Sequence, residues 1–431
     1  MLRRVSIYPL LLVNFIGTLG FSIILPFLVF LIEKFGGNAI IYGIASATYP
    51  LFQLIGAPVL GRWSDIYGRK KILFLSQSGT FVSWIIFLSA LFLPVNELLN
   101  IDSALLGRFT LTVPLIVIFI ARSLDGLTGG NISVAHAYLS DITEEKDRSS
   151  NFGKMSVSSN LGFILGPALA GVLGATVLGE VLPVSAALLI SGLAILIINV
   201  YLPESKSSIM DKNPDNVSVR KVFGQEHKEC YKLKSRQILK LNDILKLKNI
   251  PFILVLYFLI FLGFNIFYTA FPVHAVKHLK WSVTQMGVFF SILSFMMIVV
   301  QGPVLSRLSK RISDEWLTIS GSIILAINFL ILITGDFVLT YVAAVFFAVG
   351  NGIMWPSFLS ILSRTAGEKY QGTVQGFASS AGSLASIIGL IIGGILYEQL
   401  GNMAFLISAL VIFLVFIMSF RIRTFGPKRS V

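Results

Sequence analysis

The stretch Ala121–Gly171 reads ARSLDGLTGGNISVAHAYLSDITEEKDRSSNFGKMSVSSNLGFILGPALAG and holds the most unusual chemistry of the chain. Within it, Arg122 and Asp125 lie one helical turn apart, near the middle of an apolar segment at Val113–Tyr138. If that segment crosses a membrane, each charged side chain costs roughly 2.5–3.5 kcal/mol on insertion scales and is seldom retained without a use. We therefore expect the functional centre of the protein in this stretch.

The composition of the whole chain indicates that this stretch lies in a membrane. Of the 431 residues, 55% are hydrophobic and 13% are charged, whereas soluble proteins carry about 25% charged residues. The first apolar run begins at Ile7 and is too long for the core of a signal peptide, so we retain it as a spanning helix. Cys230 is the only cysteine, which excludes an intrachain disulfide and gives no spacing for a metal site. We expect a multi-pass membrane protein without a metal or a cofactor.

A spanning helix needs about 20 mostly apolar residues, and this requirement predicts twelve of them. Their ranges are Ile7–Leu31, Ala39–Leu60, Ile72–Leu93, Val113–Tyr138, Phe152–Val177, Pro183–Tyr201, Pro251–Val273, Gln285–Leu305, Leu317–Thr334, Phe337–Leu362, Thr373–Tyr397 and Ala404–Phe420. They form an N-terminal six-helix half (1–203) and a C-terminal six-helix half with a short tail (251–431), joined by a central loop (204–250). Within that loop, Ser235–Lys248 either lies on the membrane surface as an amphipathic helix or belongs to a solvated tether.

The basic residues are distributed unevenly between the loops. The chain has 34 Lys and Arg and a formal net charge of +13. Lys34, Arg108, Lys277 and Lys280 fall on one side, Arg122 falls inside a span, and the remaining 29 fall on the side of both termini. Under the positive-inside rule both termini are cytoplasmic, and the basic residues face the anionic lipid of the bilayer. This distribution argues against nucleic-acid binding as the reason for the positive charge.

The two predicted halves repeat short segments at matching positions. Such repeats are typical of transporters that rock about a central site. The matched pairs are Leu19–Ile23 with Leu262–Ile266, Ala57–Arg62 with Gly302–Arg307, and Gly166–Gly171 with Gly389–Gly394.

The turn between the second and third predicted helices reads GRWSDIYGRKK over Gly61–Lys71. Its pattern resembles the signature loop of the major facilitator superfamily, which implies twelve transmembrane helices in two pseudo-symmetric six-helix halves. The resemblance also implies a conformational latch that includes the end of the fourth helix and the loop after it. In the second copy of the turn, Lys310 replaces the Asp and Ser313 replaces the second Gly, so we expect a one-sided ionic latch. The implied latch residues are Gly61, Asp65, Gly68, Arg69, Lys70, Asp141 and Arg148.

Two further motifs resemble those of drug/proton antiporters in this superfamily, including the tetracycline-resistance-like group. The fifth predicted helix carries Gly153, Gly162, Gly166, Pro167 and Gly171, a smooth face for close helix packing together with a proline kink. The segment Arg122–Gly126 resembles the fourth-helix motif of proton-coupled members, in which the buried Arg is implicated in proton handling.

Asp125 is the only acid deep in any predicted span, because the first helix offers Asn14, Thr18 and Ser22 where many of these pumps have a carboxylate. Burial favours its neutral form and Arg122 favours its charged form. Asp125 and Arg122 therefore either form a proton-coupling pair or a permanent structural ion pair.

Polar or amphipathic residues near mid-span are the candidates for contact with substrate. An aromatic, weakly polar cavity suits a flat amphiphilic compound. We interpret His136, His274 and His278 as interfacial residues rather than metal ligands. The candidates are Asn14, Thr18, Gln53, Asn160, Asn265, Tyr268, Asn351 and Trp355.

These observations predict a monomeric secondary transporter that exports an amphiphilic small molecule or drug in exchange for protons. A proton-linked carrier of a metabolite or siderophore, working as an exporter or as an importer, is the alternative, and a transport-inactive receptor or scaffold is a remote one. The chain shows no phosphate-binding loop and no nucleophile constellation, so neither ATP-driven transport nor an enzyme is expected. The resemblance suggests a bacterial inner membrane.

Overall fold

The computed structural model describes residues 6–24, 26–103, 106–129, 131–143, 148–205, 247 and 249–425, except for the side chains of residues 131–133, 148–150, 152, 153, 156, 367–373 and 375. The predicted central loop therefore lies largely outside the described residues.

The helices of the N-terminal half begin and end where the sequence supplies a cap or a glycine. Asn38 accepts a hydrogen bond from Ile41 N at the start of α3, and Thr112 accepts one from Leu115 N at the start of α5. Gly68 separates α3 from α4 with a φ of 102°, a conformation that glycine adopts without steric cost. The helices are α1 (Tyr8–Ile23), α2 (Leu28–Lys34), α3 (Ala39–Tyr67), α4 (Arg69–Ala90), α5 (Val113–Thr128), α6 (Asn131–Ile142), α7 (Arg148–Gly174) and α8 (Val181–Tyr201).

The C-terminal half repeats this arrangement with one interruption. Pro303 lies in a short π-helix, η3, where its missing N–H breaks the regular ladder of helix hydrogen bonds. The elements are α11 (Ile250–Lys277), α12 (Val283–Val299), η3 (Val300–Val304), α13 (Leu305–Leu308), α14 (Asp314–Leu332), α15 (Phe337–Leu400), η4 (Gly401–Met403), α16 (Ala404–Ser419) and η5 (Phe420–Thr424).

Helix α15 joins the tenth and eleventh predicted spans into one element that bends back on itself. The ring of Trp355, in its first part, lies 5.4 Å from the ring of Tyr257 between centroids, and Gly382, in its second part, faces the same Tyr257 ring. A straight helix at 1.5 Å per residue would separate these two positions by about 40 Å. Both parts of α15 therefore pack against α11.

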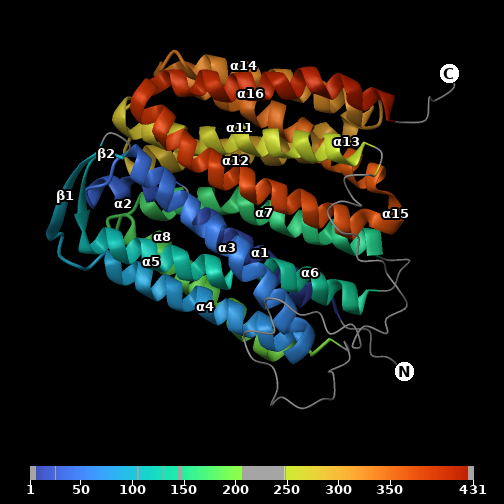
Figure 1. The fold of residues 1–431 in the computed structure, drawn as a ribbon, viewed down its shortest axis with the longest axis horizontal. Helices are drawn as coiled ribbons and strands as arrows, with labels where there is room; N and C mark the ends of the chain where they lie inside the picture. Colours follow the sequence, from blue (N-terminus) through green and yellow to red (C-terminus); the bar gives the residue numbers. More distant parts are fainter. Residues whose placement is uncertain are drawn as a thin grey trace.

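A β-hairpin that the sequence does not predict connects α4 to α5. Strands β1 (Glu97–Ser103) and β2 (Gly107–Thr112) pair antiparallel. The hairpin is fixed to the turn before α3, because Thr110 N donates to Gly36 O at 2.8 Å and Asn38 Nδ2 donates to Arg108 O at 3.1 Å. We call this end of the molecule the hairpin end and the opposite end, where α6 and α13 lie, the basic end (Figure 1).

The multi-pass helical architecture is confirmed, whereas the number of twelve spans stays a prediction. Ten helices among the described residues are long and apolar enough to cross a membrane. The fourth predicted span is divided between α5 and α6, of 16 and 12 residues. All but the first three residues of the last two predicted spans fall within one candidate segment, Gly376–Thr424.

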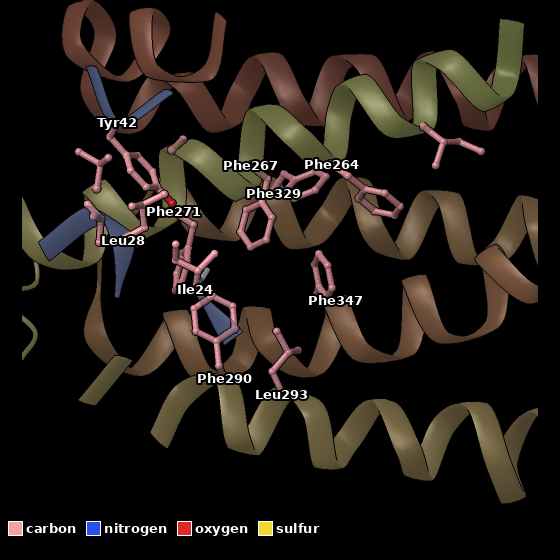
Figure 2. Packing of buried hydrophobic residues seen from close by; sticks show 14 of the residues in the cluster. Ile24, Leu28, Tyr42, Phe264, Phe267, Phe271, Phe290, Leu293, Phe329 and Phe347 are labelled. Atoms are coloured by element: carbon pink, nitrogen blue, oxygen red, sulfur yellow. The ribbon is translucent and has the colours of Figure 1, made fainter. Parts of the chain in front are cut away.

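The two halves share a hydrophobic core at the hairpin end. Ile24, Leu28 and Tyr42 of the N-terminal half belong to the same buried cluster as Phe271 and Phe290 of the C-terminal half (Figure 2). A second cluster, at the basic end, draws only on the N-terminal half among the described residues; its members include Leu10, Leu60, Leu73, Tyr138 and Met155. The structure is therefore closed between the halves at the hairpin end.

Candidate functional site

Arg122 and Asp125 are both buried in α5, with 2% and 6% of their surfaces exposed. Arg122 Nη1 lies 3.5 Å from Asp125 Oδ2, which is longer than the roughly 2.7–2.9 Å of a charge-assisted hydrogen bond. The guanidinium lies 5.0 Å from the ring centroid of Tyr49 and 5.9 Å from that of Phe21. Its Nε and Nη1 have no hydrogen-bond partner in the part of the chain that the structure describes. Aromatic faces and Coulombic attraction hold the guanidinium of Arg122, whereas the carboxyl group of Asp125 is hydrogen-bonded by the side chains of Thr80 and Ser83.

Asp125 also lines a small polar cavity inside the N-terminal half, of about 20 Å³, between α1, α3, α4, α5 and α8. Gln77 and Thr80 of α4 and Ser191 of α8 line the same cavity, and Gln77 Nε2 donates to Ser191 Oγ at 2.8 Å. Sequence reasoning missed these three residues. The signal that could have found Gln77 is a strongly polar side chain within an otherwise apolar span.

Asn14 and Thr18, two predicted cavity residues, face α7 in this conformation. Asn14 Nδ2 donates to Met155 O at 3.2 Å and to Ser159 Oγ at 2.7 Å. A Cβ added at Gly162 would lie 2.0 Å from Thr18 Oγ1. These side chains therefore join α1 to α7, as small and polar residues often do between membrane helices.

Two other predicted cavity residues of the N-terminal half are half-buried. Gln53 Nε2 donates to Gly129 O at 2.8 Å and to Tyr49 Oη at 3.1 Å. Because the ring of Tyr49 also faces Arg122, Gln53 is linked to the charged pair through one aromatic residue. Asn160 of α7 is half-buried.

The predicted cavity residues of the C-terminal half gather around an aromatic cluster. The rings of Tyr257 and Phe261 stack at 4.9 Å between centroids, and Trp355 meets Phe261 edge-on at 5.3 Å. One turn along α11, Asn265 Nδ2 donates to Ser386 Oγ of α15 at 3.0 Å. An aromatic wall with one amide beside it can contact a flat amphiphilic compound.

The remaining two candidates lie close to this wall. Tyr268 packs against Phe267 and Phe347, with ring centroids 5.6 and 6.4 Å away. Asn351 of α15 is buried, and its Oδ1 has no hydrogen-bond partner among the described residues. Such an acceptor is available to a ligand or to water.

The glycine-rich face of α7 contacts both halves. Gly162 and Gly166 face α1, and a Cβ at Gly166 would lie 1.9 Å from Ser22 Oγ. A Cβ at Gly171 would lie 2.3 Å from Gly287 Cα, in α12 of the other half. Pro167 is buried inside α7, and the surroundings of Gly153 lie outside the described residues. Helix α7 therefore connects the two halves at the hairpin end.

Arg69 is the centre of an ion-pair cluster at the basic end of the N-terminal half. Arg69 Nε lies 2.9 Å from Asp141 Oδ2, and its other nitrogens contact Asp65 and Ser64. Ser205 Oγ also donates to Asp141, at 3.1 Å. These contacts join the α3–α4 turn to the end of α6 and to the chain after α8.

The other predicted latch residues have mixed surroundings. Lys70 N donates to Glu204 Oε1 at 3.0 Å, and Gly68 lies against the same carboxylate. No atom of the described residues lies within 4 Å of the position that a Cβ at Gly61 would take, so the described helices do not approach closely there in this conformation. The side chain of Arg148 lies outside the described residues.

The C-terminal half carries an ion-pair cluster of opposite polarity at the basic end, so the expected one-sided arrangement of ion pairs is wrong. Arg364 Nη2 lies 2.9 Å from Asp314 Oδ2 and 3.1 Å from Glu315 Oε1. Asp314 is the first residue of α14, as Arg69 is of α4. The first residue of the helix is the base in the N-terminal half and the acid in the C-terminal half. A search of the second turn for the same amino acids as in the first turn overlooks this exchange.

His274 lies in the last turn of α11 and is fully buried inside the protein. Its Nδ1 lies 3.2 Å from Tyr397 Oη, and its ring stacks on His278 at 5.0 Å. The interfacial position of the histidines stays a prediction. No group of three or more His, Cys, Asp or Glu among the described residues is placed to hold a metal.

Known proteins resemble this chain in sequence and in fold. A family model described as the Major Facilitator Superfamily matches residues 10–389 and 253–431. Tetracycline resistance protein, class E, of Escherichia coli is 27% identical over 394 residues, which cover 90% of this chain and 87% of that protein. Multidrug resistance protein 2 of Bacillus subtilis (strain 168) is 26% identical over 412 residues, which cover 94% and 92%. The crystal structure of a D-xylose-proton symporter has the same fold, with a TM-score of 0.71 at 16% identity and 98% of both chains covered.

Proposed function

The chain belongs to the major facilitator superfamily, and from that premise we propose that this transporter exports an amphiphilic small molecule or drug in exchange for protons. The observation that carries the proposal is the buried Arg122–Asp125 pair, in which Arg122 Nη1 and Asp125 Oδ2 are 3.5 Å apart and the arginine Nε and Nη1 have no hydrogen-bond partner among the described residues. The tetracycline and multidrug resistance proteins among its relatives support a drug-like substrate.

The pair supplies a physical route from proton binding to conformational change. While Asp125 is ionised, its charge and that of Arg122 cancel. Protonation of Asp125 leaves Arg122 as a single buried cation, which is costly in an apolar surrounding. That cost favours whichever conformation gives Arg122 access to water, so one proton shifts the balance between the two states of the transporter.

The energy available for such exchange is adequate for accumulation against a gradient. A proton gradient supplies roughly 1.4 kcal/mol per pH unit, and the membrane potential supplies about 2.3 kcal/mol per charge per 100 mV. Rocking of the two halves would expose the aromatic wall around Trp355 to one side of the membrane and then to the other. A monomer contains both halves and suffices for this cycle.

The distribution of basic residues predicts how the transporter is oriented in the membrane. We place the basic end and both termini in the cytoplasm by the positive-inside rule, most simply in a bacterial inner membrane. The hairpin end then faces outward, and the conformation described here is closed toward the outside.

A proton-linked carrier of a metabolite or siderophore is the second candidate. The observation that favours it is α1, which has no carboxylate and whose Asn14 is engaged with α7. An amide beside an aromatic wall, as at Asn265, also suits a polyol or other polar ligand.

Transport by purified protein in proteoliposomes tests the proposal, with tetracycline as the first probe and a pH-sensitive dye inside the vesicles. We expect tetracycline flux to follow an imposed pH gradient in the wild type and to lose that response in Asp125→Asn. A monodisperse elution profile verifies that the variant is folded. Flux that ignores the pH gradient in the wild type would remove the coupling, and a fully active Asp125→Asn would move the proton site elsewhere.

A substrate screen distinguishes the two candidates. Expression in a bacterial strain that lacks its own drug pumps should raise resistance to flat amphiphilic drugs. Growth that improves instead on a limiting nutrient or iron chelate would favour the carrier.

A further inference from the structure

The polar cavity beside Asp125 has room for one water molecule. Its volume of about 20 Å³ exceeds the roughly 10–15 Å³ that a single water needs. Besides Asp125, its wall carries the polar side chains of Gln77, Thr80 and Ser191. A buried water needs two to four polar partners, and this wall offers them.

Gln77 provides an independent sign of a ligand in this cavity. The residue is 1% exposed, its Nε2 is used by Ser191, and its Oε1 has no hydrogen-bond partner in the described part of the chain. A buried acceptor without a partner carries an energetic penalty. A water in this cavity that donates a hydrogen bond to Gln77 Oε1 would remove that penalty.

The C-terminal half shows how the same place looks when it is filled by protein. Gly20 lines the cavity, and a Cβ added there would meet no atom of the described residues within 4 Å. Its repeat partner, Gly263, lies against Ile412 of α16, with Cδ1 2.8 Å from the position of a Cβ. At the matching helix of the N-terminal half, α8 lines the cavity with Ala187, Ile190 and Ser191. Among the described residues, the position of Gly20 therefore has free space that its repeat partner lacks.

We propose that this cavity is a single-water site in which Gln77 Oε1 and the Asp125 carboxyl group hold one water molecule, and that this water is the proton-exchange partner of Asp125. The second part of this inference rests on the proposed function. Gln77 is then a positioning residue that acts on Asp125 through the water.

A water molecule suits this position because it can serve both protonation states of Asp125. Beside the carboxylate, it donates one hydrogen to Asp125 and the other to Gln77 Oε1. Beside the neutral acid, it turns to accept the hydrogen of Asp125 and still donates to Gln77 Oε1. The other titratable or charged groups that face Asp125 are Arg122 of its own helix and Tyr49 of α3; α1, α4 and α8 present only uncharged groups to the cavity.

Substitutions at Gly20 test the water site directly. Gly20→Ala adds a methyl group to the cavity, and Gly20→Ser adds a hydroxyl that can both donate and accept. We expect Gly20→Ala to lower pH-driven tetracycline flux about tenfold, which corresponds to about 1.4 kcal/mol, and Gly20→Ser to retain it within about threefold. Gly302→Ala in the other half, whose Cβ also meets no atom within 4 Å, is the matched control and should match the wild type.

Infrared difference spectra of the purified full chain provide a readout independent of transport. The wild type should show an O–H band that shifts in H₂¹⁸O and is absent in Gly20→Ala and Gln77→Leu. A band that persists in both variants, or no band in the wild type, overturns the water site. Normal pH-driven flux in Gly20→Ala overturns the role of the water in proton exchange. If the bands behave as expected while wild-type flux ignores the pH gradient, the water site stands and the proposed antiport fails.

Discussion

At the scale of single residues, the contrast between Arg122 and Arg69 is informative. Arg69 is surrounded by oxygen acceptors from Ser64, Asp65 and Asp141, so it is fixed in place. Arg122 has ring faces and one carboxylate at 3.5 Å. The first arrangement suits a structural tie, and the second suits a charge whose surroundings change during a cycle.

A double substitution separates the proton-coupling interpretation of Asp125 from that of a permanent ion pair. Removing one partner of a buried pair typically costs about 3–5 kcal/mol, whereas replacing both can be nearly neutral. We expect Arg122→Gln and Asp125→Asn each to lower the Tm in detergent, and the double variant to recover most of the loss. Transport driven by a pH gradient should stay absent in the double variant; its return would show that the pair is only structural.

At the scale of the element, α7 meets the other half through backbone-to-backbone contact. The added Cβ of an alanine at Gly171 would lie 2.3 Å from a backbone carbon of Gly287, and a backbone cannot move aside as a side-chain tip can. The hairpin end can close only while both positions are glycine. The packing of this helix is therefore matched to one state of the cycle.

Gly171→Val should hold the halves apart at the hairpin end. We expect lost transport and faster thiol labelling of a cysteine at Ser291, whose Oγ now contacts Ala168 O at 3.4 Å, in a background with Cys230 replaced by Ser. Gly192→Ala is the control, because its added Cβ would meet only Phe81 of the same half, at 3.3 Å. Equal labelling of Ser291→Cys with and without Gly171→Val would contradict this account.

At the scale of the whole molecule, the two halves carry ion-pair clusters of opposite polarity at the basic end. Arg69 begins α4 and pairs with an acid, while Asp314 begins α14 and pairs with a base. Among the described residues, each ion pair at this end joins residues of one half. Each half is thereby tied internally and can move as one body.

Rocking of rigid halves predicts distance changes of opposite sign at the two ends. Spin labels at the exposed Leu98 and Lys280 report on the hairpin end, and labels at Lys154 and Lys310 report on the basic end. When the basic end closes, the distance between the labels at Leu98 and Lys280 should increase, and the distance between the labels at Lys154 and Lys310 should decrease. Pulsed electron–electron double resonance measures both distances. Changes of the same sign at both ends would contradict rigid-body rocking.

Much of the fold could be predicted because bilayer thickness dictates the length of apolar runs. The hairpin could not, because Glu97–Thr112 is too short and too mixed to stand out between spans. The site was predicted unevenly. A charged residue in an apolar span, such as Arg122, can be recognised from the sequence. Asn14 and Gln77 are both amides at mid-depth, and only the packing shows that Asn14 joins two helices and that Gln77 lines a cavity.

The hairpin has a practical consequence for imaging. The two halves look alike at low resolution, and a detergent belt hides most of a protein of this kind. Among the described residues, only the N-terminal half carries a β-hairpin, formed by strands β1 and β2. Hydrogen bonds to Gly36 and Asn38 fix this hairpin to the neighbouring turn. An antibody fragment raised against the exposed Asp102–Arg108 pair would give each particle a visible asymmetric marker, by which images could be aligned and the two halves told apart.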